Sequence, residues 1–198
     1  PWFLFGTDKM SKSKGNVLYA DDLAARFSVD AVRHYCLAEM PYASDGSITP
    51  SSIIARYNTD LANNLGNLVS RSHAMTVKYF GGKIPARGEE TETDAALRVF
   101  CEETKMRVWE ALDSYHIADA VDALFALFGR ANKYIDETMP WALAKDESKT
   151  ERLGTVMYYL LEAIRYGAAL LTPFLPTTAD KIRAPLGGAD DSTEFFAL

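Results

Sequence analysis

Residues 49–82, TPSSIIARYNTDLANNLGNLVSRSHAMTVKYFGG, carry the pattern that decides the fold. Thr49 followed by Pro50 is typical of a helix start, because threonine caps the first turn and proline fits the first helical position. Gly81 and Gly82 are typical of a helix end. We therefore predict one long helix between these signals. Its apolar residues recur with helical spacing and define one buried side: Ile54, Tyr57, Leu61, Leu65, Leu68, Met75 and Tyr79.

Three further amphipathic stretches follow, over residues 94–113, 115–138 and 148–172. The second repeats apolar residues at intervals of three and four, which is typical of a helix facing a core. These residues are Ile117, Val121, Leu124, Phe125, Phe128, Ala131 and Ile135. Strand patterns after residue 50 are nearly absent. The sequence therefore predicts a mainly α protein built as an antiparallel bundle of about four long helices.

The start of the last long helix is predicted from its capping residues. Ser148 and Glu151 have the spacing of a capping box, so Ser148 is expected to cap this helix. Pro173 and Pro176 end it, and Thr177 is expected to cap a short final helix.

The residues ahead of the bundle predict a strand, a loop and two short helices. Trp2 to Phe5 is a β-like apolar run that leads into an exposed loop rich in lysine and serine. One helix is expected to be capped by Asp21 or Asp22, and the next, capped by Ser28 or Asp30, to end at Pro41. We expect the apolar run to fray or to pair with a neighbouring chain, because its strand edges lack partners.

The composition is that of a soluble globular domain, with 198 residues, 48% hydrophobic and 24% charged. No apolar run approaches the roughly 18 residues that span a bilayer, so we expect no membrane association. The two cysteines, Cys36 and Cys101, stand apart from each other and from any histidine pair. We therefore expect no disulfide framework, no metal site and a cytoplasmic location.

The charge is unevenly distributed along the chain, although its net value is −6. Residues 1–87 carry ten basic and seven acidic residues, whereas residues 88–198 carry eleven and twenty. A polyanionic partner is therefore expected to contact the first part of the chain.

The loop from Lys9 to Asn16, with the sequence KMSKSKGN, is the sharpest local motif. Three lysines spaced by small hydroxyl residues and followed by glycine suit the oxygens of a triphosphate. The alternative is a solvated surface loop. A phosphate-binding loop of the GxxxxGK[ST] type is excluded because that string does not occur.

Two further features suit the recognition of unstacked bases. On the polar side of the long helix, formed by Asp60, Asn64, Asn67, Arg71 and Lys78, an asparagine and an arginine lie one turn apart. Asn67 and Arg71 together offer an amide and a donor fork to base edges. Trp141, which follows Met139 and Pro140, could stack on an extruded base. The alternative for Asn67 and Arg71 is that they lie on an ordinary solvated helix face. The alternative for Trp141 is that it packs at the edge of the core.

His34, His73 and His116 are expected to be structural or surface residues.

Taken together, these motifs resemble the class I aminoacyl-tRNA synthetases, whose signature loop KMSKS is matched letter for letter by Lys9 to Ser13. Residues 60–71, DLANNLGNLVSR, and residues 131–145, ANKYIDETMPWALAK, resemble the methionyl-tRNA synthetases in particular. The resemblance covers about residues 5 to 185.

This resemblance implies two domains. Residues 1–48 would be the end of the catalytic domain with the KMSKS loop and the connector called the stem-contact fold, and residues 49–198 the α-helical anticodon-binding domain. Lys9 and Lys12 would act in catalysis, and Lys9, Met10, Ser11, Lys12 and Ser13 would bind ATP. Asn67, Arg71 and Trp141 would read the anticodon CAU of the tRNA partner.

The activity implied is that of a methionine–tRNA ligase, which uses methionine and ATP with Mg²⁺. The chain opens at Pro1 inside an apolar run and lacks the family's His-x-Gly-His motif. We therefore expect a C-terminal fragment that is monomeric and inactive alone, with no tightly bound cofactor. Two alternatives stay open, a fragment of another class I synthetase, such as the cysteinyl or isoleucyl enzyme, and a helical binding module with no catalytic origin.

Overall fold

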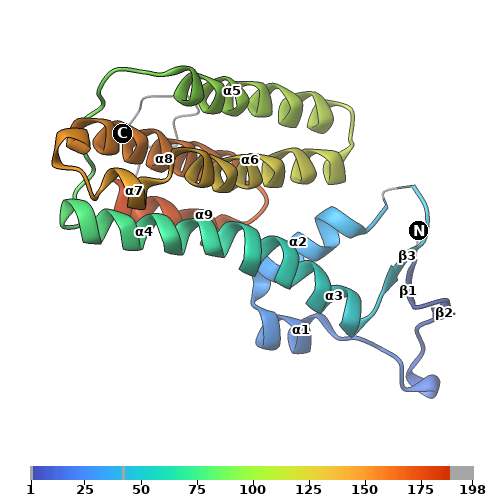
Figure 1. Ribbon diagram of the computed structural model, residues 1–198. Coiled ribbons are helices and arrows are strands. Elements are labelled where there is room, and N and C mark those ends of the chain that lie inside the picture. The colour runs from blue at the N-terminus through green and yellow to red at the C-terminus, as the bar shows by residue number, and fades with distance from the viewer. Residues whose placement is uncertain (1, 42, 188–198) are drawn as a thin grey trace.

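A continuous helix from Pro50 to Phe80 joins the two ends of the molecule, as the computed structural model shows (Figure 1). It consists of α3 (Pro50–Arg56), a π-helical segment η2 (Tyr57–Gly66) and α4 (Asn67–Phe80). The structure describes residues 2–41 and 43–187. The end of the predicted second domain, residues 188–198, therefore lies outside the described residues.

The predicted ends of this helix are confirmed. The Thr49 hydroxyl accepts a hydrogen bond from the backbone N–H of Ser52, whose side chain accepts one from the N–H of Thr49. The helix ends at Gly81, whose φ of 61° favours glycine.

The predicted buried side is wrong at the start of the helix. Ile53 is buried, whereas Ile54 is 47% and Tyr57 37% exposed. The prediction assumed an α-helix throughout, with a rotation of about 100° per residue. The π-helical turns between Tyr57 and Gly66 contain more residues than α-helical turns, so the buried side before them is rotated relative to the buried side after them.

Gly66 closes the π-helical segment at a position where a side chain does not fit. A Cβ built on Gly66 would lie 2.7 Å from the backbone oxygen of Leu61, five residues earlier. The carbonyl group of the wider turn therefore occupies the space that any other residue would need.

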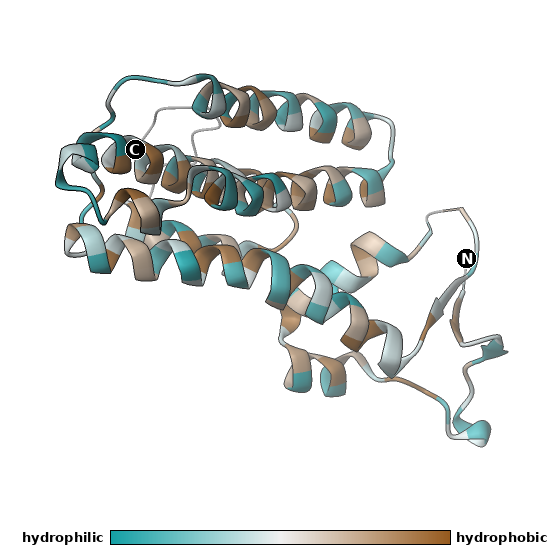
Figure 2. Ribbon diagram, in the orientation of Figure 1, coloured by the Kyte–Doolittle hydropathy of each residue, from teal (hydrophilic) through white to brown (hydrophobic). Residues whose placement is uncertain are grey.

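The bundle is completed by α5 (Glu92–Asp113), α6 (Ile117–Thr138), α7 (Pro140–Leu143), α8 (Thr150–Leu171) and α9 (Pro176–Arg183). The mainly α fold class is thus confirmed. In Figure 1, α5 and α4 lie on opposite sides of α6 and α8. Helix α8 is buried along almost its whole length, and α4 shows alternating hydrophilic and hydrophobic bands in Figure 2, as expected for a helix with one buried side.

The core of the bundle gathers large apolar side chains from α4, α5, α6 and α8. Members with less than 2% exposure include Leu68, Leu97, Leu124, Phe128, Ile135, Met157 and Leu160. Helices α6 and α8 approach closely at Gly167, where a Cβ would lie 2.5 Å from the ring of Phe128. None of the helices that the structure describes is long and apolar enough to cross a membrane.

A three-stranded sheet lies at the other end of the molecule, in the order β2–β1–β3. Strand β1 (Phe3–Phe5) pairs antiparallel with β2 (Asp8–Lys9) and parallel with β3 (Gly46–Ile48). The expectation that this apolar run frays is therefore wrong. It forms the central strand, because the chain returns through α1 (Ala20–Phe27) and α2 (Val29–Glu39) to place β3 beside it.

Several predicted caps are replaced by other contacts. Helix α1 begins at Ala20, so Asp21 and Asp22 lie in its first turn, whereas Ser28 caps α2 as predicted. Ser148 lies in a 3₁₀ turn, where Asp146 accepts its N–H, and the capping box predicted there is absent.

The predicted cap at Thr177 is also wrong, because α2 supplies that contact from a distant part of the chain. Asp30 Oδ2 accepts the N–H of Thr178 at 2.6 Å, in the first turn of α9. One turn further along α2, the Arg33 guanidinium donates to the backbone oxygens of Pro173 and Phe174 at 3.0 and 2.9 Å. Helix α2 therefore holds both ends of the turn between α8 and α9.

A buried carboxylate, Asp94, joins α5, α6 and α8. It accepts hydrogen bonds from both terminal nitrogens of Arg152, at 2.5 and 2.9 Å, and from the Tyr134 hydroxyl. Burial alone would raise the pKa of Asp94, but these hydrogen bonds and those from Thr91 outweigh burial and lower it. The charged form therefore stabilises the folded bundle.

We predict that Asp94→Asn lowers the free energy of unfolding at pH 7 by about 3 kcal/mol, because Arg152 loses its anionic partner. Since the folded pKa lies below the unfolded one, this contribution is present above about pH 4 and is lost as the pH falls through the folded pKa. Urea unfolding of both proteins at several pH values measures it. The exposed Glu103→Gln is the control, and an equal loss at pH 3 and pH 7 would contradict the prediction.

We predict that Gly66→Ala destabilises the fold by about 1–3 kcal/mol, because its Cβ meets a backbone oxygen that cannot move freely. The matched control is Gly129→Ala on α6, where a Cβ meets nothing within 4 Å. That change should stabilise by about 0.5–1 kcal/mol, as alanine does in an ordinary helix. Thermal unfolding measures both, and two changes of the same sign would refute the assignment.

Candidate functional site

The lysine loop is an exposed turn that begins where β2 ends. Ser11 caps the 3₁₀ turn η1 (Lys12–Lys14) by accepting the N–H of Lys14 at 3.2 Å, and Gly15 closes the turn with a φ of 67°. The side chains of Lys9, Lys12 and Ser13 are exposed, while Ser11 is half-buried. Met10 packs against the small cluster formed by Leu23, Tyr35, Ile48 and Ile53.

Asn16 closes this loop, a role that the sequence pattern did not reveal. Its Oδ1 accepts the N–H of Ser11 at 2.9 Å, and its Nδ2 donates to the backbone oxygen of Lys9 at 3.3 Å. The only signal available was an asparagine directly after a glycine, which is common in turns of every kind.

The lysines of the loop differ in their partners. Lys9 Nζ lies 5.1 Å from the centre of the Trp2 ring, and Lys14 Nζ lies 3.7 Å from Asp8. Within the described part of the chain, Lys12 has no ion-pair partner. Its ammonium group is therefore available to an anion that approaches the loop.

The residues predicted to read bases lie on α4 and α7 in the bundle, whereas this loop lies beside the sheet, outside the bundle (Figure 1). Asn67, the first residue of α4, is exposed, and its N–H donates to the backbone oxygens of Ala62 and Asn64. Arg71, one turn later, is half-buried, and its Nη2 lies 3.0 Å from Asp136 Oδ1 on α6. The two predicted readers therefore share one side of α4, next to α6.

Trp141 lies just beyond the end of α6. Met139 adopts a φ of 45°, which ends α6, and Pro140 opens the short helix α7. Pro140 is buried, whereas Trp141 is 42% exposed. The tryptophan is therefore not a plug in the core, and it follows by five residues the aspartate that holds Arg71.

Two residues assigned to the polar side of the long helix do not lie on its exposed face. Asp60 is buried beside His34, with Nε2 to Oδ2 at 2.8 Å, and beside Arg56, with Nε to Oδ2 at 2.6 Å. Asn64 turns toward α6, where its Nδ2 donates to the backbone oxygen of Phe125 at 3.0 Å. The π-helical turns again account for the difference, and His34 has the structural role expected of it.

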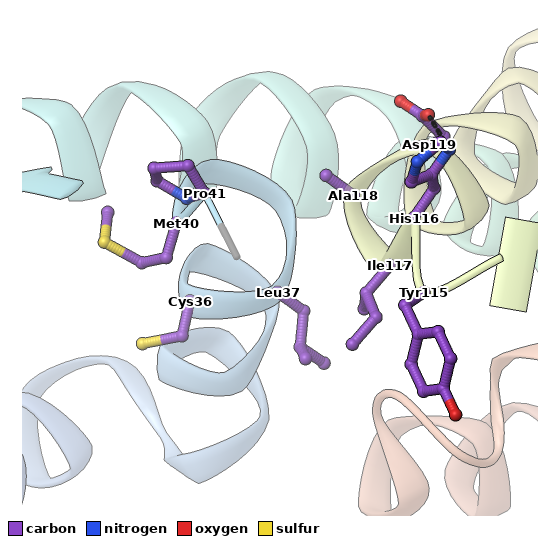
Figure 3. A pocket seen from close by; sticks show the side chains of 9 residues that line it. All are labelled: Cys36, Leu37, Met40, Pro41, Tyr115, His116, Ile117, Ala118 and Asp119. Atoms are coloured by element: carbon purple, nitrogen blue, oxygen red, sulfur yellow. Dashed lines mark ion pairs between the residues drawn. The ribbon is translucent and has the colours of Figure 1, made fainter. Parts of the chain in front are cut away.

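An open hollow of about 460 Å³ lies between α2 and the turn from α5 to α6 (Figure 3). Leu37 and Ile117 approach each other across it, and an ion pair joins His116 to Asp119 at 3.6 Å. The hollow includes none of the predicted site residues. Among the residues that the structure describes, no group of three or more His, Cys, Asp or Glu side chains could hold a metal ion.

Two family models match the chain, one over its first part and one over its second. Residues 1–73 match the model described as tRNA synthetases class I (M), which, with the lysine loop, defines the class of protein. Residues 84–195 match the model described as the anticodon binding domain of methionyl tRNA ligase. Because this second match covers more than half of the chain, the chain belongs to the methionyl tRNA ligase family.

Relatives and solved structures agree with this assignment. The chain is 44% identical to the methionine–tRNA ligase of Caldanaerobacter subterraneus subsp. tengcongensis and 48% identical to that of Halalkalibacterium halodurans, with 100% of the chain covered. It is similar to Mycobacterium tuberculosis methionyl-tRNA synthetase in complex with methionyl-adenylate, with a TM-score of 0.90 and 38% identity over 96% of the chain and 38% of that structure. The chain spans 31% and 30% of the two relatives' lengths.

These matches remove the alternatives that the sequence left open. Against a different class I specificity, residues 84–195 match the anticodon-binding model of methionyl tRNA ligase, and the relatives named above are methionine–tRNA ligases. A helical module unrelated to the synthetases would not match the class I model over residues 1–73.

We predict that Asn16→Ala loosens the lysine loop without unfolding the protein. Loss of the bond from the Ser11 N–H should speed exchange of that amide about threefold to tenfold, the effect of one net hydrogen bond. Amide hydrogen exchange followed by NMR measures it. Ser13→Ala is the control, because the one hydrogen bond of the Ser13 hydroxyl among the described residues is to the Ser11 side chain, at 3.3 Å. Equal exchange in both variants would show that Asn16 does not hold the loop.

Proposed function

We propose that this chain is part of a methionine–tRNA ligase and that it reads the anticodon of the tRNA. The observation that carries the proposal is the pair Asn67, which is exposed, and Arg71, which is half-buried, one turn apart on α4. They lie next to the helix that leads to the exposed Trp141. Membership of the family supports it, because residues 84–195, which include Trp141, match an anticodon-binding domain. Asn67 and Arg71 lie ahead of that match, within residues 1–73 that match the class I model.

The two ends of the molecule are proposed to belong to different domains. Residues 1–48, with the sheet, the lysine loop, α1 and α2, are proposed to be the end of the catalytic domain and the stem-contact connector. Residues 49–198 are proposed to be the anticodon-binding domain. The continuous helix and the contacts from α2 to the α8–α9 turn would keep the two in fixed relation.

The three proposed readers offer complementary chemistry to the bases of CAU. The Asn67 amide can donate and accept at a base edge, and the Arg71 guanidinium can donate to base oxygens or nitrogens. Trp141 offers a ring on which an unstacked base can lie. Asp136 already binds one side of the Arg71 guanidinium, so it limits the directions from which a base can approach.

The lysine loop is proposed to act on ATP in the whole protein. Lys9 and Lys12 would neutralise phosphate charge while the carboxylate of methionine attacks the α-phosphate and pyrophosphate leaves. Met10, Ser11 and Ser13 would complete the loop around the nucleotide, which is expected to carry Mg²⁺. The M. tuberculosis relative in complex with methionyl-adenylate supports this chemistry.

The test is binding of the chain to an anticodon stem-loop with CAU and to stem-loops with one base changed, at two salt concentrations. We expect a base change to cost about 1–3 kcal/mol, and Asn67→Ala, Arg71→Ala and Trp141→Ala each to reduce that difference. Lys78→Ala is the control, because loss of a surface cation should weaken all stem-loops alike. Equal binding of all stem-loops by the unmodified chain would refute anticodon reading.

A further inference from the structure

The Asn132 side chain helps to hold the π-helical segment on α6. Its Nδ2 donates to the backbone oxygen of Asn64 at 3.1 Å and to the Asn64 Oδ1 at 3.2 Å. The same nitrogen lies 3.1 Å from the backbone oxygen of Phe128 in its own helix. A single donor group thus serves three oxygens, two of which belong to Asn64.

The backbone oxygen of Asn64 also belongs to the turn from which Asn67 emerges. The N–H of Asn67 donates to the backbone oxygens of Ala62 and Asn64. This N–H lies where the π-helical segment ends at Gly66 and α4 begins. One of the two oxygens that accept the Asn67 N–H is therefore the one that Asn132 contacts.

An external contact can stabilise a change from π to α turns. Within a regular helix each backbone oxygen has a fixed partner, but at the junction the hydrogen-bonding interval changes and the path of the chain is less determined. Here Asn64 contacts α6 twice more, through its Nδ2 to Phe125 and its Oδ1 to Asn132. These contacts fix the rotation at which α4 begins.

We propose that Asn132 is a positioning residue for anticodon reading, an inference that rests on the proposed function. It holds the Asn64 carbonyl group, fixes the π-to-α junction and so sets the direction of the Asn67 side chain. Asp136, one turn further along α6, holds Arg71 at 3.0 Å. Both proposed readers on α4 are thus aligned by the same side of α6.

The role requires a donor at position 132. Asn132→Asp keeps the size of the side chain but replaces the donating nitrogen with a negatively charged oxygen. That oxygen would face the two oxygens of Asn64 and the backbone oxygen of Phe128, so the junction should be pushed away from α6. Asn132→Ala removes the contact and leaves the Asn64 oxygens without this partner.

The experiment combines two measurements on the whole 198-residue chain. The first is amide hydrogen exchange at Asn67, which reports the junction without any RNA. The second is the ratio of affinities for the CAU stem-loop and a stem-loop with one base changed. For Asn132→Asp and Asn132→Ala we expect faster exchange at Asn67 and a ratio reduced about threefold to tenfold, the effect of losing one hydrogen bond.

The matched control is Cys101→Ala, a fully buried position on α5, which lies across α6 and α8 from α4 (Figure 1). It should lower stability by creating a cavity but leave Asn67 exchange, relative to global unfolding, and the affinity ratio unchanged. A structural role alone would make the Asn132 variants behave like this control.

The possible outcomes separate the two proposals. If the unmodified chain does not discriminate between stem-loops, anticodon reading fails and the positioning inference falls with it, whatever the exchange data show. If the chain discriminates, a reduced ratio with faster Asn67 exchange in both Asn132 variants supports the inference. An unchanged ratio, or unchanged Asn67 exchange, overturns it.

Discussion

The buried carboxylate of Asp60 is the contact on which the arrangement of the two ends of the molecule depends. It lies inside the π-helical segment and meets His34 from α2 and Arg56 from α3. Arg56 extends the network to Glu39 on α2 and Asp122 on α6. Because a buried charge is stable only with partners, these three elements must meet around the long helix where it passes from the connector into the bundle.

The sequence predicts the helices well wherever local signals decide them. Thr49, Pro50 and Gly81 mark the ends of the long helix correctly because their contacts lie within a few residues. The predicted caps at Ser148 and Thr177 are wrong because other side chains accept the backbone N–H groups at these helix starts. Asp146 accepts the N–H of Ser148, and the distant Asp30 accepts the N–H of Thr178. No pattern within a helix start reveals a partner 148 residues away.

The candidate site also contains residues that local sequence predicts and residues that only the fold reveals. The proposed readers Asn67 and Trp141 can be picked out from residue type and spacing, and the structure places both at the surface. Asp60 and Asn64 were assigned to that exposed face because the π-helical turns are invisible to a count based on 3.6 residues per turn. Asn16 and Asn132 were missed because a lone asparagine carries no periodicity, and only the fold shows which oxygens it meets.

The π-helical segment restricts how this protein can change during evolution. Each residue added to or removed from an α-helix rotates everything beyond it by about 100° and shifts it by about 1.5 Å. A deletion between Arg56 and Asn67 would therefore turn the outward residues of α4 toward α6 and its apolar side toward water. Related chains should accordingly keep the length of this segment, and insertions should accumulate in the connection between α4 and α5 instead.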